Sequence, residues 1–261
     1  MSPPTSPHAH PGVFALGWAF WEGPLPRHPL FFVNLNQRSY EEELMDRQDA
    51  DPKRLKKTIE QFDLLNRLFA SAIPLFKKHL LPKMLAEPDR LWTVLDFGSG
   101  GGDIDRAVVR LCRKKGLKVK VTALDLDARV LPWAQHLCRD YPEITPIAGS
   151  IFDLATLGDF DFIVSNHTLH HFTYPQVRRA VELCLIHARH GFLLNDLRRS
   201  FWAYVGYTIF TGLLIKGSLA FSDGRLSIRR GFTVAELEKE LDGLARPIRI
   251  GRAAPARIYL Y

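Results

Sequence analysis

Four glycines in five positions, set between a short apolar run and a helical pattern, constrain the fold of this chain more than any other feature. The run 93–97 is typical of a strand, the segment 98–102 carries the glycines, and a helix is expected to begin near Ile104. Glycine lets the main chain turn tightly and approach a ligand, and the free N–H groups at a helix start favour a polar or anionic group. The turn therefore predicts a site for a nucleotide-like ligand at the end of a strand.

From residue 90 to residue 261 short apolar runs alternate with helical patterns. This alternation predicts an α/β fold: a Rossmann-like, doubly wound, mostly parallel sheet of seven strands with right-handed crossovers. Five strands are expected over 92–97, 119–124, 145–149, 160–165 and 191–195, and helices over 103–115, 130–138 and 176–187. The tail breaks the pattern, with a helix expected over 235–241 and an antiparallel terminal hairpin of 246–250 and 257–261.

Two further segments are expected to extend this domain of 90–261. Residues 1–89 should form an N-terminal arm (1–35) and a helical cap of two or three amphipathic helices, with Pro52 and Pro74 near their boundaries. The stretch 201–215 has no charged residue, but its glycines and threonines favour a buried lid helix over a membrane span. We therefore expect a lid insertion around 198–232.

The composition is that of an ordinary globular protein, with 46% hydrophobic and 24% charged residues, which excludes disordered and collagen-like architectures. The three cysteines show no C-x-x-C spacing, so neither a zinc site nor a disulfide framework is expected. A cytoplasmic location without a secretory signal fits this usage. The net charge of +7, concentrated after residue 198, permits contact with nucleic acid, anionic lipid or a phosphorylated substrate.

Acidic residues at the ends of two expected strands, with the spacing of the glycines, bear on whether the ligand is a nicotinamide dinucleotide or S-adenosylmethionine. Asp125 follows the expected strand 119–124, where its carboxylate can accept hydrogen bonds from ribose hydroxyls, whereas Asp127 is interpreted as a helix N-cap. In a nicotinamide-binding turn the third glycine would fall at Asp103, whose carboxylate would face the pyrophosphate unfavourably. Asp96 is instead suited to S-adenosylmethionine, because a carboxylate there attracts the ammonium and sulfonium charges.

With these motifs the sequence resembles the class I S-adenosylmethionine-dependent methyltransferases. Asp96, Gly98, Gly100 and Gly102 match their D-x-G-x-G-x-G motif, and the run Leu169-His170-His171-Phe172 is similar to that of small-molecule enzymes of the quinone and natural-product type. Residues 42–46, 64–67, 195–199 and 223–233 also resemble methyltransferases encoded near polyketide synthases. The resemblance implies S-adenosylmethionine as cofactor, bound by Asp96, Gly98, Gly100, Gly102, Asp125, Leu126, Ser150, Ile151, Asn166 and His167. Ser150 departs from the family, which usually has an acid there.

The resemblance also points to a catalytic pair, His170 and Asp196. Each follows a strand, so both should lie at the carboxyl edge of the sheet beside the cofactor crevice. A hydroxyl acceptor needs a base, which His170 would supply while Asp196 orients it. The alternatives are a packed or capping imidazole and a salt bridge of Asp196 with Arg198 or Arg199. His171 is interpreted as structural.

The acceptor is expected to be a small lipophilic or phenolic molecule. The apolar lid could contact it, or pack against the N-terminal helices, and with Arg225, Arg229 and Arg230 it could rest on an anionic membrane. A nucleic-acid methyltransferase is disfavoured because Ser165-Asn166-His167-Thr168 replaces an Asn-Pro-Pro-Tyr strand exit, and a non-catalytic cofactor-binding protein is the remaining alternative. No metal site is expected, because no carboxylate stands at helical spacing from His167, His170 and His171.

Overall fold

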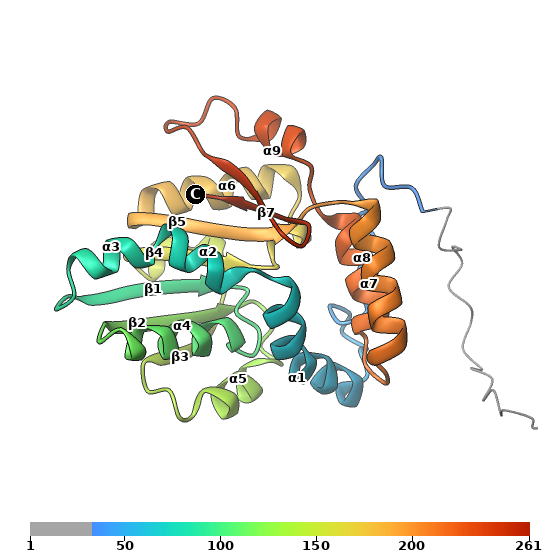
Figure 1. The fold of residues 1–261 in the computed structure, drawn as a ribbon, viewed down its shortest axis with the longest axis horizontal. Helices are drawn as coiled ribbons and strands as arrows, with labels where there is room; N and C mark the ends of the chain where they lie inside the picture. The colour runs from blue at the N-terminus through green and yellow to red at the C-terminus, as the bar shows by residue number, and fades with distance from the viewer. Residues whose placement is uncertain (1–32) are drawn as a thin grey trace, which may run out of the picture. The chain divides into compact units, whose positions relative to one another are not determined.

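One seven-stranded sheet organises the protein in the computed structural model, which describes residues 33–261. Its strand order is β3-β2-β1-β4-β5-β7-β6, and all pairs are parallel except the two made by β7 (Figure 1). The strands are β1 (Leu91–Phe97), β2 (Lys118–Asp125), β3 (Ile144–Ala148), β4 (Phe160–Asn166), β5 (Ala188–Leu197), β6 (Ile250–Ala253) and β7 (Arg257–Leu260). The predicted fold class is confirmed.

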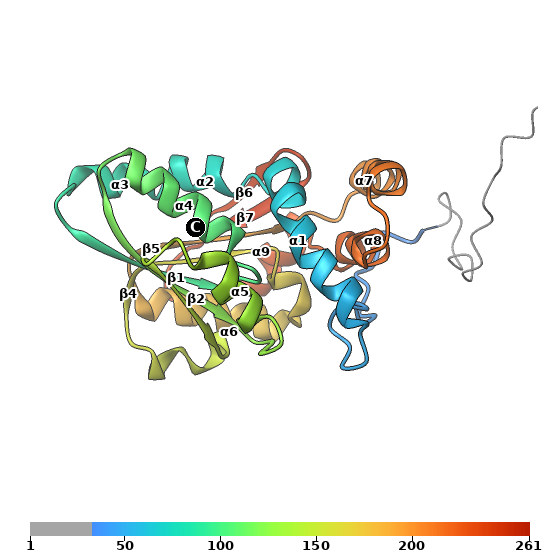
Figure 2. The ribbon, with the colours of Figure 1, turned by 90° about the horizontal axis from the view of Figure 1, so that it is seen from below.

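Helices cover both faces of the sheet, because the strands alternate apolar side chains between two cores. Val94 of β1 faces α2, α3 and α4, whereas its neighbour Leu95 faces α6 and α9. Figure 2 shows α2, α3 and α4 on one side of the sheet and α6 on the other. Burial on both faces explains why these strands are almost continuously apolar in sequence. The helices are α1 (Pro52–Phe69), α2 (Ala72–His79), α3 (Leu81–Ala86), α4 (Asp103–Lys114), α5 (Leu131–Cys138), α6 (Tyr174–His187), α7 (Phe201–Leu214), α8 (Ala220–Arg230) and α9 (Val234–Glu240), with the 3-10 helices η1 (Ile151–Thr156) and η2 (Leu169–His171).

The segment before the sheet is helical only from residue 52. Asp51 accepts hydrogen bonds from the Lys53 and Arg54 amides, and Pro52 occupies the first turn of α1, where its missing N–H has no cost. Residues 40–51 form turns rather than helix. The expected arm lies almost entirely outside the described residues.

The segment expected to form a lid consists of two helices, α7 and α8, which pack on each other and on α1. The contact with α1 is apolar, since Leu65 of α1 meets Ile215 and Ala220 in one buried cluster. Figure 2 shows α1, α7 and α8 together beyond one end of the sheet. The structure corrects the expectation of a buried lid helix, because α8 covers one side of α7 and Trp202 remains 79% exposed. Among the described residues no helix is both long and apolar enough to cross a membrane.

The terminal hairpin is shifted from its expected position. Its first strand is β6 at Ile250–Ala253 rather than 246–250, because a short turn joins Ala253 directly to its partner Arg257.

Asp127 also differs from the expected helix cap. Its carboxylate accepts from the Arg129 amide in a turn that precedes α5.

Candidate active site

A cavity of about 890 Å³ lies at the carboxyl ends of β1, β2 and β4. The sheet edge forms one wall, and α1, α8 and the turns of 40–51 contribute to the other. Parallel strands present their turns at this edge, which is where ligands bind in open α/β sheets. Of the residues expected to bind the cofactor, all line this cavity except Gly102: Asp96, Gly98, Gly100, Asp125, Leu126, Ser150, Ile151, Asn166 and His167.

The glycine turn brings main chain to the cavity wall. Gly98 (φ +70°) and Gly100 (φ +53°) adopt left-handed backbone conformations that favour glycine. A Cβ at Gly98 would overlap the Thr168 side chain, whereas one at Gly100 would meet no protein atom within 4 Å. Gly102 has a different role, because it precedes α4 and a Cβ there would lie 2.7 Å from Cys138 Sγ. The main chain is thus open toward a ligand at Gly100.

Asp125 joins the end of β2 to the glycine turn. Its Oδ2 accepts from the Gly100 amide at 2.7 Å, and its Oδ1 accepts from the Asp127 amide at 2.9 Å. Burial raises the pKa of this carboxyl above its ordinary value. Each oxygen keeps a second lone pair, so the side chain can hold the turn and still accept from hydroxyls in the cavity.

Asp96 brings an unsatisfied carboxylate to the same wall. It is only 2% exposed, and its Oδ1 has no hydrogen-bond partner. Burial, with Asp105 beside it, raises the pKa of Asp96, and burial raises that of Asp105 to about 7. A cationic group placed at this oxygen would remove the cost of the buried acid. The residues present therefore fit a ligand that carries positive charge at the glycine turn.

Three further predicted residues complete the wall around these carboxylates. Asn166 follows β4, and its Nδ2 is buried without a partner while its Oδ1 accepts from Asn195 at 2.7 Å. His167 adopts φ +68°, and burial together with Arg257 beside it lowers its pKa. Ser150 Oγ accepts from the Phe152 amide at 3.1 Å, so its hydroxyl hydrogen is free to donate.

The predicted pair His170 and Asp196 is brought together. Asp196 Oδ2 accepts from the His170 amide at 2.7 Å, and Oδ1 lies 2.8 Å from His170 Nδ1. Both side chains are fully buried, and neither lines the cavity. Burial lowers the pKa of His170, but Asp196 and Glu43 outweigh it and raise that pKa to about 9. The alternative pairing of Asp196 with Arg198 or Arg199 does not occur: Arg199 pairs with Glu236, and among the described ion pairs Arg198 has none with Asp196.

Known proteins share both the sequence family and the fold of this region. Residues 94–191 match the family described as "Methyltransferase domain". By this match, residues 94–191 form a methyltransferase domain. No curated protein has a significantly similar sequence.

Solved structures of methyltransferases share the fold at low sequence identity. A SAM-dependent methyltransferase from Aquifex aeolicus is 18% identical with a TM-score of 0.53, covering 81% of this chain and 97% of its own. The plantazolicin methyltransferase BamL, in complex with a triazolic desmethyl analogue and SAH, is 15% identical with a TM-score of 0.56 and coverages of 78% and 74%. The CurJ carbon methyltransferase is 17% identical with a TM-score of 0.55 and coverages of 83% and 61%.

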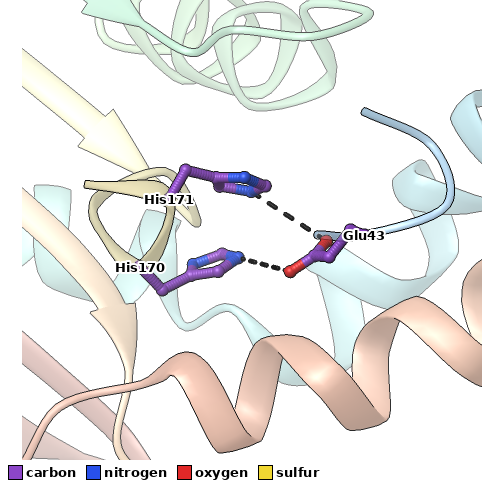
Figure 3. A group of neighbouring side chains, drawn as sticks. All are labelled: Glu43, His170 and His171. Carbon is purple, nitrogen blue, oxygen red and sulfur yellow. Dashed lines mark ion pairs between the residues drawn. The ribbon is translucent and has the colours of Figure 1, made fainter. Parts of the chain in front are cut away.

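Several residues that line the cavity were missed by the sequence analysis. Glu43 is 2% exposed, and its Oε1 lies 3.4 Å from His170 Nε2 while its Oε2 lies 4.0 Å from His171 Nε2 (Figure 3). His171, interpreted as structural, lines the cavity, with its Nδ1 2.9 Å from Asp46 Oδ2. The acids of 42–46 were noticed only as part of a resemblance, since no periodic pattern links them to residues 170–171.

Arg257 also enters the site from a distant part of the enzyme. Pairing of β7 with β5 places it beside Asn195, and its Nε donates to Asn195 Oδ1 at 3.3 Å. Burial lowers the pKa of this guanidinium to about 10. Its position on the last strand of the sheet offered no sequence signal, because basic residues are common throughout this part of the chain.

Proposed function

We propose that this enzyme transfers the methyl group of S-adenosylmethionine to a hydroxyl of a small lipophilic acceptor, phenolic in the simplest case. The observation that carries the proposal is one cavity lined by two chemically different groups of residues. One group is the glycine turn with Asp96 and Asp125, and the other is the titratable group of Glu43, Asp46 and His171. Apolar side chains of α1 and the lid occupy the remaining wall, among them Phe62, Leu65, Phe69 and Tyr207.

The glycine-turn side is suited to the donor. S-adenosylmethionine supplies, when bound, a methyl group on a positively charged sulfur. Asp96 would compensate that charge, Asp125 would accept from the ribose hydroxyls, and Gly98 and Gly100 would let the main chain approach. Leu126, Ser150 and Ile151 would border the adenine, while Asn166 and His167 would separate donor from acceptor.

Removing the Asp125 carboxylate should weaken donor binding. We expect Asp125→Ala to lose about 1–3 kcal/mol of binding free energy, because the variant loses charged hydrogen bonds and the link that holds the Gly100 amide. Titration calorimetry with S-adenosylmethionine measures the loss. Asp127→Ala is the matched control, since Asp127 also lines the cavity but pairs with Arg129. Unchanged affinity in Asp125→Ala, or binding of NAD by the parent, would contradict this role.

The titratable group of Glu43, Asp46 and His171 is suited to an acceptor that must lose a proton. In-line methyl transfer needs an oxygen lone pair directed at the methyl carbon, so positioning is the first requirement and deprotonation the second. His170, held by Asp196, would act as the base or organise it, and His171 and Glu43 carry the network to the cavity surface. The product proton would leave through these groups.

The apolar wall favours an aromatic or lipid-like acceptor, as in natural-product biosynthesis. A cavity of this size holds a small molecule and is walled largely by aromatic and aliphatic side chains. The plantazolicin methyltransferase, which shares the fold at 15% identity, was solved with a triazolic desmethyl analogue and SAH. The enzyme would work in the cytoplasm, in keeping with its three free cysteines.

Peripheral membrane contact would give a lipophilic acceptor a short route to this cavity. Trp202, Ile209, Leu213 and Leu214 of α7 are all more than half exposed, whereas the arginines expected to face lipid are engaged within the protein. Arg225 donates to the Tyr204 hydroxyl, and Arg229 donates to Glu41 at 2.8 Å. Contact would therefore rest on apolar insertion rather than on anionic lipid.

Exposed apolar residues of α7 should control binding to lipid. We expect the double variant Trp202→Asp, Leu213→Asp to bind neutral phosphatidylcholine vesicles roughly tenfold more weakly than the parent, because two large side chains no longer insert. Cosedimentation measures the bound fraction. Ile186→Asp is the control, since Ile186 is 65% exposed on α6. Equal binding by the parent and the double variant would exclude this surface.

Methyl transfer itself is tested with donor labelled in its methyl group. The purified chain is incubated with labelled S-adenosylmethionine and extracts of the source cell, and the labelled product is identified. We expect label in an ether of a hydroxylated, lipophilic compound. Label on nitrogen or carbon would overturn the hydroxyl assignment, and label in nucleic acid would overturn the small-molecule assignment.

A further inference from the structure

We propose that Glu43, His170 and His171 form a binding site for one divalent cation of the zinc type. The site deepens the proposed function and rests on it, because Glu43 and His171 line the same cavity as the glycine turn. Binding of the ion depends only on these side chains, so it can be tested without donor or acceptor. Sequence reasoning expected no metal site because no carboxylate stands near the histidines, and the fold supplies one from residue 43.

The three potential ligand atoms already surround one point. One nitrogen of each imidazole and one oxygen of Glu43 lie within 4.8 Å of one another, and His170 Nε2 is 3.4 Å from Glu43 Oε1 (Figure 3). Zinc binds nitrogen and oxygen at about 2.0–2.2 Å, so neighbouring donors of a tetrahedral ion lie about 3.4 Å apart. His171 Nε2, at 4.0 Å from Glu43 Oε2, needs only a small movement to complete the set.

The far nitrogen of each imidazole is engaged by a carboxylate. His170 Nδ1 lies 2.8 Å from Asp196 Oδ1, and His171 Nδ1 lies 2.9 Å from Asp46 Oδ2. Each carboxylate accepts a hydrogen bond only if Nδ1 carries the proton, so Nε2 is the nitrogen of each ring that is left to bind a cation, which displaces any proton held there. Carboxylates behind metal-binding histidines fix ring orientation and tautomer in this way.

One buried nitrogen of the cluster lacks a hydrogen-bond partner. His170 is fully buried, and its Nε2 has no hydrogen-bond partner. Glu43 Oε1 accepts from the Ser227 hydroxyl at 2.8 Å, and the nearest guanidinium nitrogen, on Arg230, stands 3.8 Å from it. A cation between the three side chains would satisfy the orphaned nitrogen and the carboxylate together.

The donor set selects the class of ion. Two imidazoles and one carboxylate suit zinc and similar transition metals rather than magnesium or calcium, which prefer oxygen. Three protein ligands leave a fourth position, and two of the three residues line the cavity. A bound ion would lower the pKa of an acceptor hydroxyl that reaches this position. The hydroxyl proton would pass to water, the oxygen would bond to the methyl carbon, and both electrons of the broken carbon–sulfur bond would stay on sulfur, leaving a neutral thioether.

Metal titration of the full chain tests the site. Chelator-treated protein is titrated with Zn²⁺ in the calorimeter and with Co²⁺ under visible absorption, in the absence of donor. We expect one equivalent to bind, with the absorption of tetrahedral Co²⁺. Asp46→Asn should weaken binding about 10–100-fold, because it removes a carboxylate behind a ligand. His171→Ala and Glu43→Gln should abolish the tetrahedral spectrum.

The control is another histidine with a single carboxylate partner. His187 Nδ1 lies 2.9 Å from Asp159, and His187→Ala should bind metal like the parent. Thermal melting and S-adenosylmethionine affinity establish that each variant is folded, and they report on the donor site separately. Absence of a bound equivalent in the parent, or equal binding by His171→Ala and the parent, would overturn the metal site while leaving methyl transfer intact.

Discussion

Replacing His170 by alanine should lower the rate of methyl transfer about 10²–10⁴-fold with little change in donor affinity. The imidazole bridges Asp196 and Glu43 behind the acceptor side of the cavity, so its loss removes the group that organises deprotonation. The donor side is formed by other residues and should keep its affinity. The effect is expected whether His170 acts as a base or as a ligand of the proposed ion.

Single-turnover rates with the identified acceptor measure this effect. Because removing one member of a buried ion pair costs about 3–5 kcal/mol of stability, rates are compared at a temperature where melting curves show the variant folded. His170→Gln keeps a hydrogen-bonding side chain of similar reach, and His187→Ala controls for loss of a carboxylate-paired histidine outside the cavity. Near-parental rates in His170→Ala would leave positioning alone as the mechanism and favour a carbon or already ionised nucleophile.

A side chain at Gly100 should eliminate measurable donor binding. Gly100 lines the cavity at φ +53°, and the space beside its Cα holds no protein atom within 4 Å. In Gly100→Val the branched side chain would occupy the space in which the donor approaches the main chain of the glycine turn. We expect affinity to fall at least about 100-fold, which corresponds to about 2.7 kcal/mol.

Gly116 provides a control that shares the backbone strain. It also has a positive φ (+69°) with no protein atom within 4 Å of a built Cβ, but it lies outside the cavity, between α4 and β2. Gly116→Val should therefore lose comparable stability and retain parental affinity for S-adenosylmethionine in calorimetry. Similar affinities for the two variants would show that the Gly100 turn does not contact the donor.

Local patterns in the sequence were sufficient for the sheet and for the donor side of the cavity. The strands and the glycine turn are set by residues close to one another in sequence. Asp125 could be placed because the carboxyl ends of parallel strands meet at one edge of the sheet. The structure confirms the predicted α/β fold, and it places Asp96, Gly98, Gly100 and Asp125 on one wall. Their functional roles stay predictions.

Only the tertiary structure decided that Glu43 meets the two adjacent histidines at the cavity. Glu43 meets His170 and His171 because the turns of 40–51 contact both α8 and the segment that follows β4, a path that no periodicity records. His170 lies behind the cavity wall and His171 on it, although the two are adjacent in sequence. Sequence periodicity shows which face of a helix or strand is buried. Which residues pack against that face depends on how the whole chain folds, so the contact of Glu43 with the histidines could not be predicted.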